Sequence, residues 1–155
     1  MKDVQNISFW WKEFEASAPE PAQFGRERLH GQVAYFATIR KDNLPRLHPV
    51  TPFISKGHLY VFMEPKSLKA RDLERGSAYG MHSGVADNDG SNGEFQIVGY
   101  ADRVRDAGVW QHAAASDPFK PEPHYTLFEL GITEALSTVY RNDAPVRTKW
   151  KAVAP

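Results

Sequence analysis

The chain has 155 residues, and its 19 Lys and Arg are balanced by 19 Asp and Glu, so its formal net charge is zero. A balanced charge creates no global field toward nucleic acid or an anionic membrane, and we expect neither as a partner. Cysteine is absent, which excludes disulfides, thiolate nucleophiles and cysteine-held metals. The length predicts one domain over residues 1–155. Without a run of 18 apolar residues the sequence predicts no membrane span, and we expect a cytoplasmic protein.

The first thirty residues have helical periodicity. Aromatic residues recur at helical spacing after Ser8, and Pro19 and Pro21 interrupt the pattern before a second amphipathic segment. We therefore expect N-terminal helices at about 8–30 that pack against the rest of the domain.

Three runs rich in β-branched and aromatic residues precede a short helical segment in the middle of the chain. We expect strands at 33–40, 46–55 and 58–63 and a helix at about 67–75. Pro49 and Pro52 lack a ladder donor, so the second strand must be bent or bulged. Ser67 is a natural N-cap for the helix.

The second half of the chain adds more strands and one helix. Strands are expected at 77–83, 94–104, 127–132, 135–139 and 147–151, and a helix at 106–115. Gly80 and Gly99 fall inside strand patterns, and Gly80 marks a close backbone approach, whereas Gly99 marks a barrel corner or a place where a ligand comes close. About six strands with two or three short helices suit a closed or split β-barrel. A Rossmann fold is excluded because strands and helices do not alternate and no G-x-G-x-x-G is present.

Arg46, Ser67 and Lys69 are residue types that bind a phosphate group. Ser67 and Lys69 fall in the first turn of the expected helix, where backbone N–H groups lack partners. Arg46 begins the 46–55 strand, and if that strand pairs with the 58–63 strand as a hairpin, Arg46 reaches the same corner. The competing interpretation is a capped surface helix with ordinary solvated cations.

The sequence contains no motif for a metal site or for a hydrolase nucleophile. The six histidines form no H-x-H or H-x-x-x-H pair, and the acidic loop at 84–94 lacks the ligand spacing of a calcium site, so we predict no metal. There is no G-x-S-x-G elbow, which argues against a hydrolase.

Several segments, in their order and spacing, resemble the FMN-binding split-barrel family typified by pyridoxamine 5'-phosphate oxidase. They are AxxATxR, PRxHPVTPF, LYVFMEPKSLKARDL and EFQIVGYADRV, within about 31–150. The resemblance implies a mainly β split barrel with a few short helices, FMN as cofactor, and a homodimer with its cofactor sites at the subunit interface. It also implies a flavin-dependent oxidoreductase that acts on a small molecule.

Carried over residue by residue, the resemblance makes Arg46 and Lys69 the cations for the FMN phosphate, helped by Ser67. Phe62 and Met63 match positions that line the flavin. The remaining cofactor positions that it implies are His48 and Thr51 near the flavin or substrate, Gln96 (or else Glu94) from the partner subunit, and Trp150 over the ring. No side chain is assigned as catalytic.

Two departures argue against pyridoxamine phosphate as the substrate. Thr51 stands where the oxidase has a lysine, and VRTKWKA has no clear match to the substrate-binding Arg-x-His pair. Two alternatives remain open. One is a reductase of the same fold that uses the deazaflavin coenzyme, whose acidic tail would need more basic surface. The other is a non-enzymatic flavin or ligand carrier.

Overall fold

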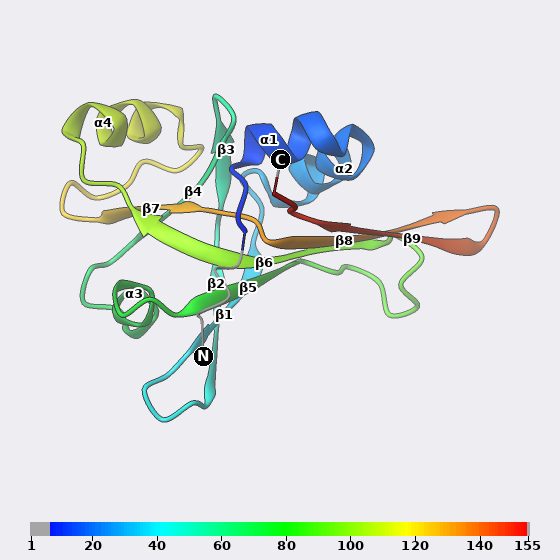
Figure 1. Cartoon of the computed structure of the whole chain (residues 1–155), viewed down its shortest axis with the longest axis horizontal. Coiled ribbons are helices and arrows are strands. Elements are labelled where there is room, and N and C mark those ends of the chain that lie inside the picture. The colour runs from blue at the N-terminus through cyan, green and yellow to red at the C-terminus, as the bar shows by residue number, and fades with distance from the viewer. Residues whose placement is uncertain (1–6, 155) are drawn as a thin grey trace.

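A curled antiparallel sheet with four short helices around it forms the body of the molecule (Figure 1). The structure is a computed structural model, and it describes residues 7–154. Its strands are β1 (Ala34–Ile39), β2 (Pro45–Val50), β3 (Phe53–Ser55), β4 (His58–Met63), β5 (Ala78–Ser83), β6 (Glu94–Arg103), β7 (Thr126–Leu130), β8 (Glu134–Arg141) and β9 (Ala144–Lys151). Its helices are α1 (Trp11–Ser17), α2 (Pro19–Leu29), α3 (Leu68–Glu74) and α4 (Ala107–Ser116).

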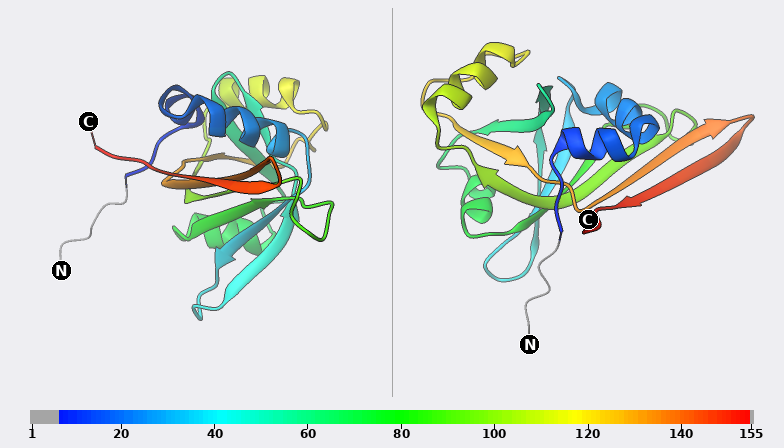
Figure 2. Two further views of the ribbon diagram at one scale, coloured as in Figure 1. Left: turned by 90° about the vertical axis from the view of Figure 1, so that its right-hand side faces the viewer. Right: turned by 45° about the horizontal axis from the view of Figure 1, so that its top comes forward.

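The strand order makes this sheet a half-barrel that is open on one side. The main path runs β2-β1-β5-β6-β7-β4-β3, and β8 and β9 continue from β6 as a hairpin that projects from the body (Figures 1 and 2). β2 and β3 are consecutive in sequence but lie at opposite ends of the path. The predicted mainly β, split-barrel fold class is confirmed, although the described residues contain nine strands and four helices rather than about six strands and two or three helices. No helix in residues 7–154 is long and apolar enough to cross a bilayer.

The expected strand at 46–55 is divided into two strands that pair with different neighbours. β2 pairs with β1, where Arg46 lies opposite Thr38, and β3 pairs with β4. The division falls at Thr51-Pro52, so the predicted bend is a complete break between strands. The expectation that Arg46 would reach the helix through a hairpin with the 58–63 strand is therefore wrong. Arg46 belongs to the β1–β2 hairpin.

β6 is the strand shared by the two halves of the sheet. On one edge it pairs first with β8 and then with β7, and the change of partner occurs at Gly99. The Gly131 N–H donates to the Tyr100 carbonyl at 2.9 Å, and a Cβ on Gly99 would lie 1.9 Å from the Gly131 oxygen. The backbone of Gly131 thus approaches closely at Gly99, where the sheet turns the predicted barrel corner. The close backbone approach predicted at Gly80 is wrong, because a Cβ there would meet only the Val98 side chain, at 3.7 Å.

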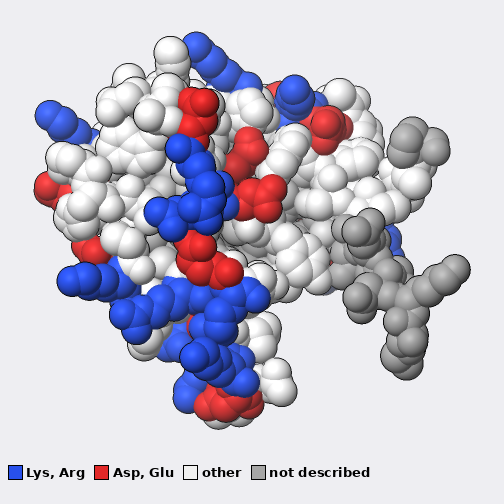
Figure 3. Space-filling model, turned by 60° about the vertical axis from the view of Figure 1, so that its left-hand side comes forward, with Lys and Arg blue, Asp and Glu red and all other residues white. Residues whose placement is uncertain are grey.

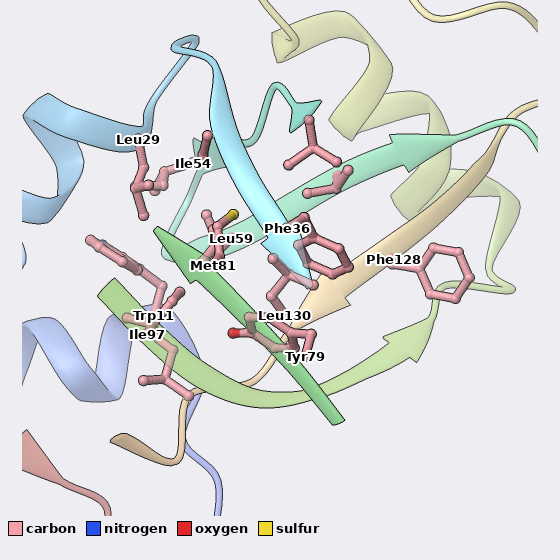
Figure 4. Close-up of a cluster of buried hydrophobic side chains, with 14 of the residues drawn as sticks. Trp11, Leu29, Phe36, Ile54, Leu59, Tyr79, Met81, Ile97, Phe128 and Leu130 are labelled. Atoms are coloured by element: carbon pink, nitrogen blue, oxygen red, sulfur yellow. The ribbon is translucent and has the colours of Figure 1, made fainter. Parts of the chain in front are cut away.

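Two apolar clusters lie on opposite faces of the curled sheet. The larger one fills the inside of the half-barrel (Figure 4) and is closed by α1, whose Trp11 and Phe14 are fully buried. The smaller one lies on the outside, beneath α4, and consists mainly of Phe53, Tyr60, Ala113 and Leu127. Asp106 caps α4, as predicted, because its Oδ1 accepts the Val109 N–H at 2.9 Å.

We expect Gly99→Ala to destabilise the fold by about 1–3 kcal/mol or more, because the new methyl group meets a backbone oxygen that cannot move aside. Urea denaturation of the variant measures the loss. Gly80→Ala is the matched control, since it adds the same methyl group in the middle of a strand at ordinary contact distance. Equal stability of both variants would contradict the close approach.

Candidate functional site

The buried carboxylate of Asp72 joins α3 to the β1–β2 hairpin. Asp72 is 1% exposed. Its oxygens accept hydrogen bonds from Thr38 Oγ1 at 2.6 Å, Arg46 Nε at 2.7 Å and Arg75 Nη2 at 2.7 Å. Thr38 and Arg46 are opposite each other in the β1–β2 register, so both reach the same carboxylate from one face of the hairpin.

These bonds determine the ionisation of Asp72. Burial by itself would raise the pKa of this carboxyl, but the hydrogen bonds from Arg46, Thr38 and Arg75 together hold it below its ordinary value. The carboxylate therefore stays charged and fixes the two guanidinium groups. Arg46 uses Nε for Asp72, and no bond within residues 7–154 is recorded for its two terminal nitrogens.

A pocket of about 330 Å³ lies beside Asp72, and we call it the α3 pocket. Its walls come from the β1–β2 hairpin and from α3, and they consist of Arg40, Lys41, Asp42, Arg46, Leu68, Arg71, Asp72 and Arg75. Figure 3 shows Lys and Arg side chains gathered on this part of the surface. Four of these cations, Arg40, Lys41, Arg71 and Arg75, were not predicted from the sequence as site residues. The spacing of Arg71 and Arg75, which puts both on one face of a helix, was the available signal.

Ser67 and Lys69 lie in the first turn of α3. Ser67 is the predicted N-cap, since its Oγ accepts the Ala70 N–H at 3.3 Å. Lys69 is half-buried, burial lowers the pKa of its amine, and within residues 7–154 its side chain has no recorded hydrogen bond or ion pair. Lys69 follows Leu68 by about 100° around the helix. It does not line the α3 pocket, whereas Arg46 does, so among the described residues the two predicted phosphate cations do not share one pocket.

His48 and Thr51 lie along the open side of the half-barrel. His48 is on the same face of β2 as Arg46, because strand residues alternate between faces. It is exposed, and its Nδ1 lies 2.9 Å from the Pro49 carbonyl. Thr51 is half-buried in the short link between β2 and β3.

Phe62 and Met63 point into the two apolar clusters. Met63 is 1% exposed and belongs to the larger cluster, and Phe62 stacks on Phe53 and meets the edge of Trp110 beneath α4. Their side chains therefore pack inside the protein. A ligand beside β4 would contact the backbone of these two residues.

Gln96 and Trp150 line a second cavity, of about 490 Å³, which we call the β6–β9 cavity. Lys149 and Lys151 lie on the same walls. The Trp150 indole is held against α1, where its Nε1–H donates to Ser17 Oγ at 3.0 Å and its ring meets Phe14. Gln96 therefore lines the cavity from β6, whereas the indole of Trp150 is already hydrogen-bonded and packed against α1.

The outer surface of β2, β1, β5 and β6 carries an apolar patch, which we call the outer face. The register aligns Leu47, Ala37, Gly80 and Val98 in one row across these strands, and the next row contains Tyr35 and Gln96. Leu47 is 71% exposed and Tyr35 is 48% exposed. Because Gln96 and Val98 also line the β6–β9 cavity, the outer face and that cavity are continuous.

We expect Asp72→Asn to cost on the order of 3 kcal/mol at pH 7, because two guanidinium groups lose their shared buried acceptor. A lowered pKa stabilises the fold above the unfolded value of about 3.9, and this contribution disappears as the pH falls below it. The stability gap between wild type and variant, measured by urea denaturation, should therefore narrow below about pH 4.

Asp42→Asn is the control for this experiment, because Asp42 pairs with Arg40 at 2.7 Å on the surface. Exposed pairs contribute little, so its loss should stay below about 1 kcal/mol. A gap for Asp72→Asn that is constant from pH 7 to pH 3 would contradict the charged state of Asp72.

No protein-family model matches the sequence, and no curated protein matches it significantly. Solved structures do match the fold. A candidate pyridoxamine 5'-phosphate oxidase from Lactobacillus delbrueckii is 19% identical with a TM-score of 0.56, over 76% of this chain and 90% of that one. A haem storage protein from Vibrio cholerae is 19% identical with a TM-score of 0.58, over 74% and 89% of the two chains.

A haem-binding protein from Mycobacterium smegmatis is 13% identical with a TM-score of 0.60, and the match covers 81% of this chain and 55% of that one. At these identities the likeness concerns the fold. The half-barrel described above thus has the split-barrel fold that these proteins share.

Proposed function

We propose that the chain binds FMN and acts as a flavin-dependent oxidoreductase on a small molecule. The observation that carries this proposal is a pair of cations beside α3, with Lys69 in its first turn and Arg46 on β2, bound to Asp72 of the same helix. Lys69 is a half-buried amine without a recorded partner among the described residues, and Arg46 is fixed by Asp72 through Nε with its terminal nitrogens left over. A phosphate between them would receive charge-assisted hydrogen bonds and would favour the protonated form of Lys69.

The chain also offers residues that can contact the ring system of FMN. An isoalloxazine ring needs apolar contact on its faces and polar groups at its edge. The open side of the half-barrel offers His48, Thr51 and the backbone of β4, and the β6–β9 cavity offers Gln96. These places lie on different parts of one chain, so we propose that a second copy completes each site, with the outer faces of two chains in contact.

In this arrangement the flavin supplies the redox chemistry when it is bound, and the residues of the chain bind and orient it. Arg46 and Lys69 hold the phosphate end, Ser67 keeps the helical turn in place, and the packed outer faces exclude water from the ring. The substrate would enter from the open side of the half-barrel, near His48. No side chain is assigned a proton-transfer role.

The deazaflavin coenzyme is the second candidate, and the α3 pocket favours it. Five of the residues that line this pocket are cations and two are acids. This surplus is greater than a single phosphate needs, and it would suit a coenzyme with an acidic tail. Haem is a further ligand to test, because two proteins of this fold are described as haem proteins.

We expect the purified protein to be yellow, and Lys69→Ala to weaken FMN binding by about 10- to 150-fold, the equivalent of about 1.5–3 kcal/mol for a charge-assisted hydrogen bond. Quenching of flavin fluorescence during titration measures the affinity. Lys66→Ala is the matched control, because Lys66 is an exposed lysine just before the same helix.

Melting temperatures measured with FMN, with the deazaflavin coenzyme and with haem separate the candidates, since a ligand raises the melting temperature of the state that it binds. A protein stabilised by haem or by the deazaflavin, and not by FMN, would overturn the FMN proposal. Bleaching of the bound flavin by NADH or NADPH would separate an enzyme from a carrier.

We expect Leu47→Glu to dissociate a dimer and to weaken FMN binding together with it, because a carboxylate would be buried in the centre of the outer face. Light scattering coupled to gel filtration measures the mass, and the FMN titration is repeated on the same sample. Phe119→Glu is the control, since Phe119 is 60% exposed in the segment between α4 and β7. A wild-type protein that is monomeric with FMN bound would contradict the shared site.

A further inference from the structure

The α3 pocket concentrates more positive charge than the proposed phosphate site uses. Arg40, Lys41, Arg46, Arg71 and Arg75 share one pocket of about 330 Å³ in a chain whose formal net charge is zero. Asp72 and Asp42 offset only two of these charges. Three positive charges therefore remain without a counterion among the lining residues.

Repulsion among the cations of the α3 pocket lowers the free energy of unfolding unless an anion is bound there. Arg71 and Arg75 are four residues apart on α3, and like charges at this spacing repel each other. The side chains of Lys41 and Arg71 make no recorded hydrogen bond or ion pair with any residue in 7–154. A solvated surface would normally intersperse acids among such cations.

The pocket is also partly preorganised. Asp72 is nearly inaccessible and holds Arg46 and Arg75, whose side chains are only 22% and 34% exposed. Arg75 Nη2 also donates to the Ile39 carbonyl at 3.4 Å, and Arg40 is held by Asp42 at 2.7 Å. Donors fixed in this way lose less freedom when they bind an anion.

We propose that the α3 pocket binds a second anionic group of the ligand, beyond the phosphate that lies between Arg46 and Lys69. This inference rests on the proposed function and extends it. Arg46 and Leu68 line the α3 pocket, and Leu68 directly precedes Lys69 in the first turn of α3, so one ligand can extend from one place to the other. The second group is a phosphate or carboxylate, supplied either by the diphosphate of a dinucleotide or by the acidic tail of the deazaflavin coenzyme.

The double variant Lys41→Gln/Arg71→Gln tests this proposal. Neither side chain forms a hydrogen bond or ion pair within residues 7–154, so their replacement leaves no group unpaired. The change also relieves the repulsion between Arg71 and Arg75, and the variant should therefore fold with an unchanged melting temperature. Lys66→Gln is the control with one exposed charge removed outside the pocket. Dissociation constants are measured for FMN, FAD and the tailed deazaflavin at one ionic strength, because salt screens such contacts.

We expect wild type to bind FAD or the tailed deazaflavin at least about ten-fold more tightly than FMN, the size of one charge-assisted contact. The double variant should lose this preference while its affinity for FMN changes by less than about two-fold. A preference for FAD identifies the diphosphate as the source, and a preference for the deazaflavin identifies the tail. No preference in wild type, or a preference that survives in the double variant, would overturn the proposal.

Binding of inorganic pyrophosphate distinguishes a failure of the proposed anion pocket from a failure of the proposed flavin function. Its binding is measured by calorimetry on protein without flavin. If pyrophosphate binds to wild type and not to the double variant while no flavin binds at all, the anion pocket stands and the flavin function is wrong. If FMN binds with the expected loss in Lys69→Ala but no ligand distinguishes the double variant, the flavin function stands and the second anion site is wrong.

Discussion

The buried carboxylate of Asp72 is the interaction on which the candidate site depends. Without it, the arginines of α3 and of the β1–β2 hairpin would face each other without a shared buried counterion and would repel each other. With it, Thr38, Arg46 and Arg75 converge on one charged acceptor, and the remaining N–H groups of both guanidiniums are held in place. The carboxylate is too deeply buried to contact a ligand, so it acts through the arginines that it orients.

The split barrel separates two groups of candidate site residues within one chain. β6 changes partner at Gly99, so the sheet curls without closing, and β2 and β3 remain at its two ends. The cations lie near one end of the sheet, whereas Gln96 lies on β6 beside the projecting β8–β9 hairpin. A cofactor that used both would have to bridge two copies of the chain. This is the physical reason to propose that the site is shared.

Sequence reasoning succeeded where the signal is local. The strand at 58–63, the N-caps Ser67 and Asp106 and the irregularity at the prolines of the 46–55 segment depend on residues within a few positions of one another. It failed where partners are distant. Asp72 lies 26 residues from Arg46 and 34 from Thr38, and no periodicity indicates that they meet. The four extra cations were missed for the same reason, because the pocket forms only when α3 packs against the hairpin.

The β8–β9 hairpin has a further consequence for how another chain can approach. β9 pairs only with β8 and is exposed along almost its whole length, so its other edge could recruit a foreign strand. Pro145, Arg147 and Lys149 lie along this edge strand, and prolines and cations are the residues that discourage such strand addition. Growth of the sheet into a fibre by strand addition at this edge is thereby opposed.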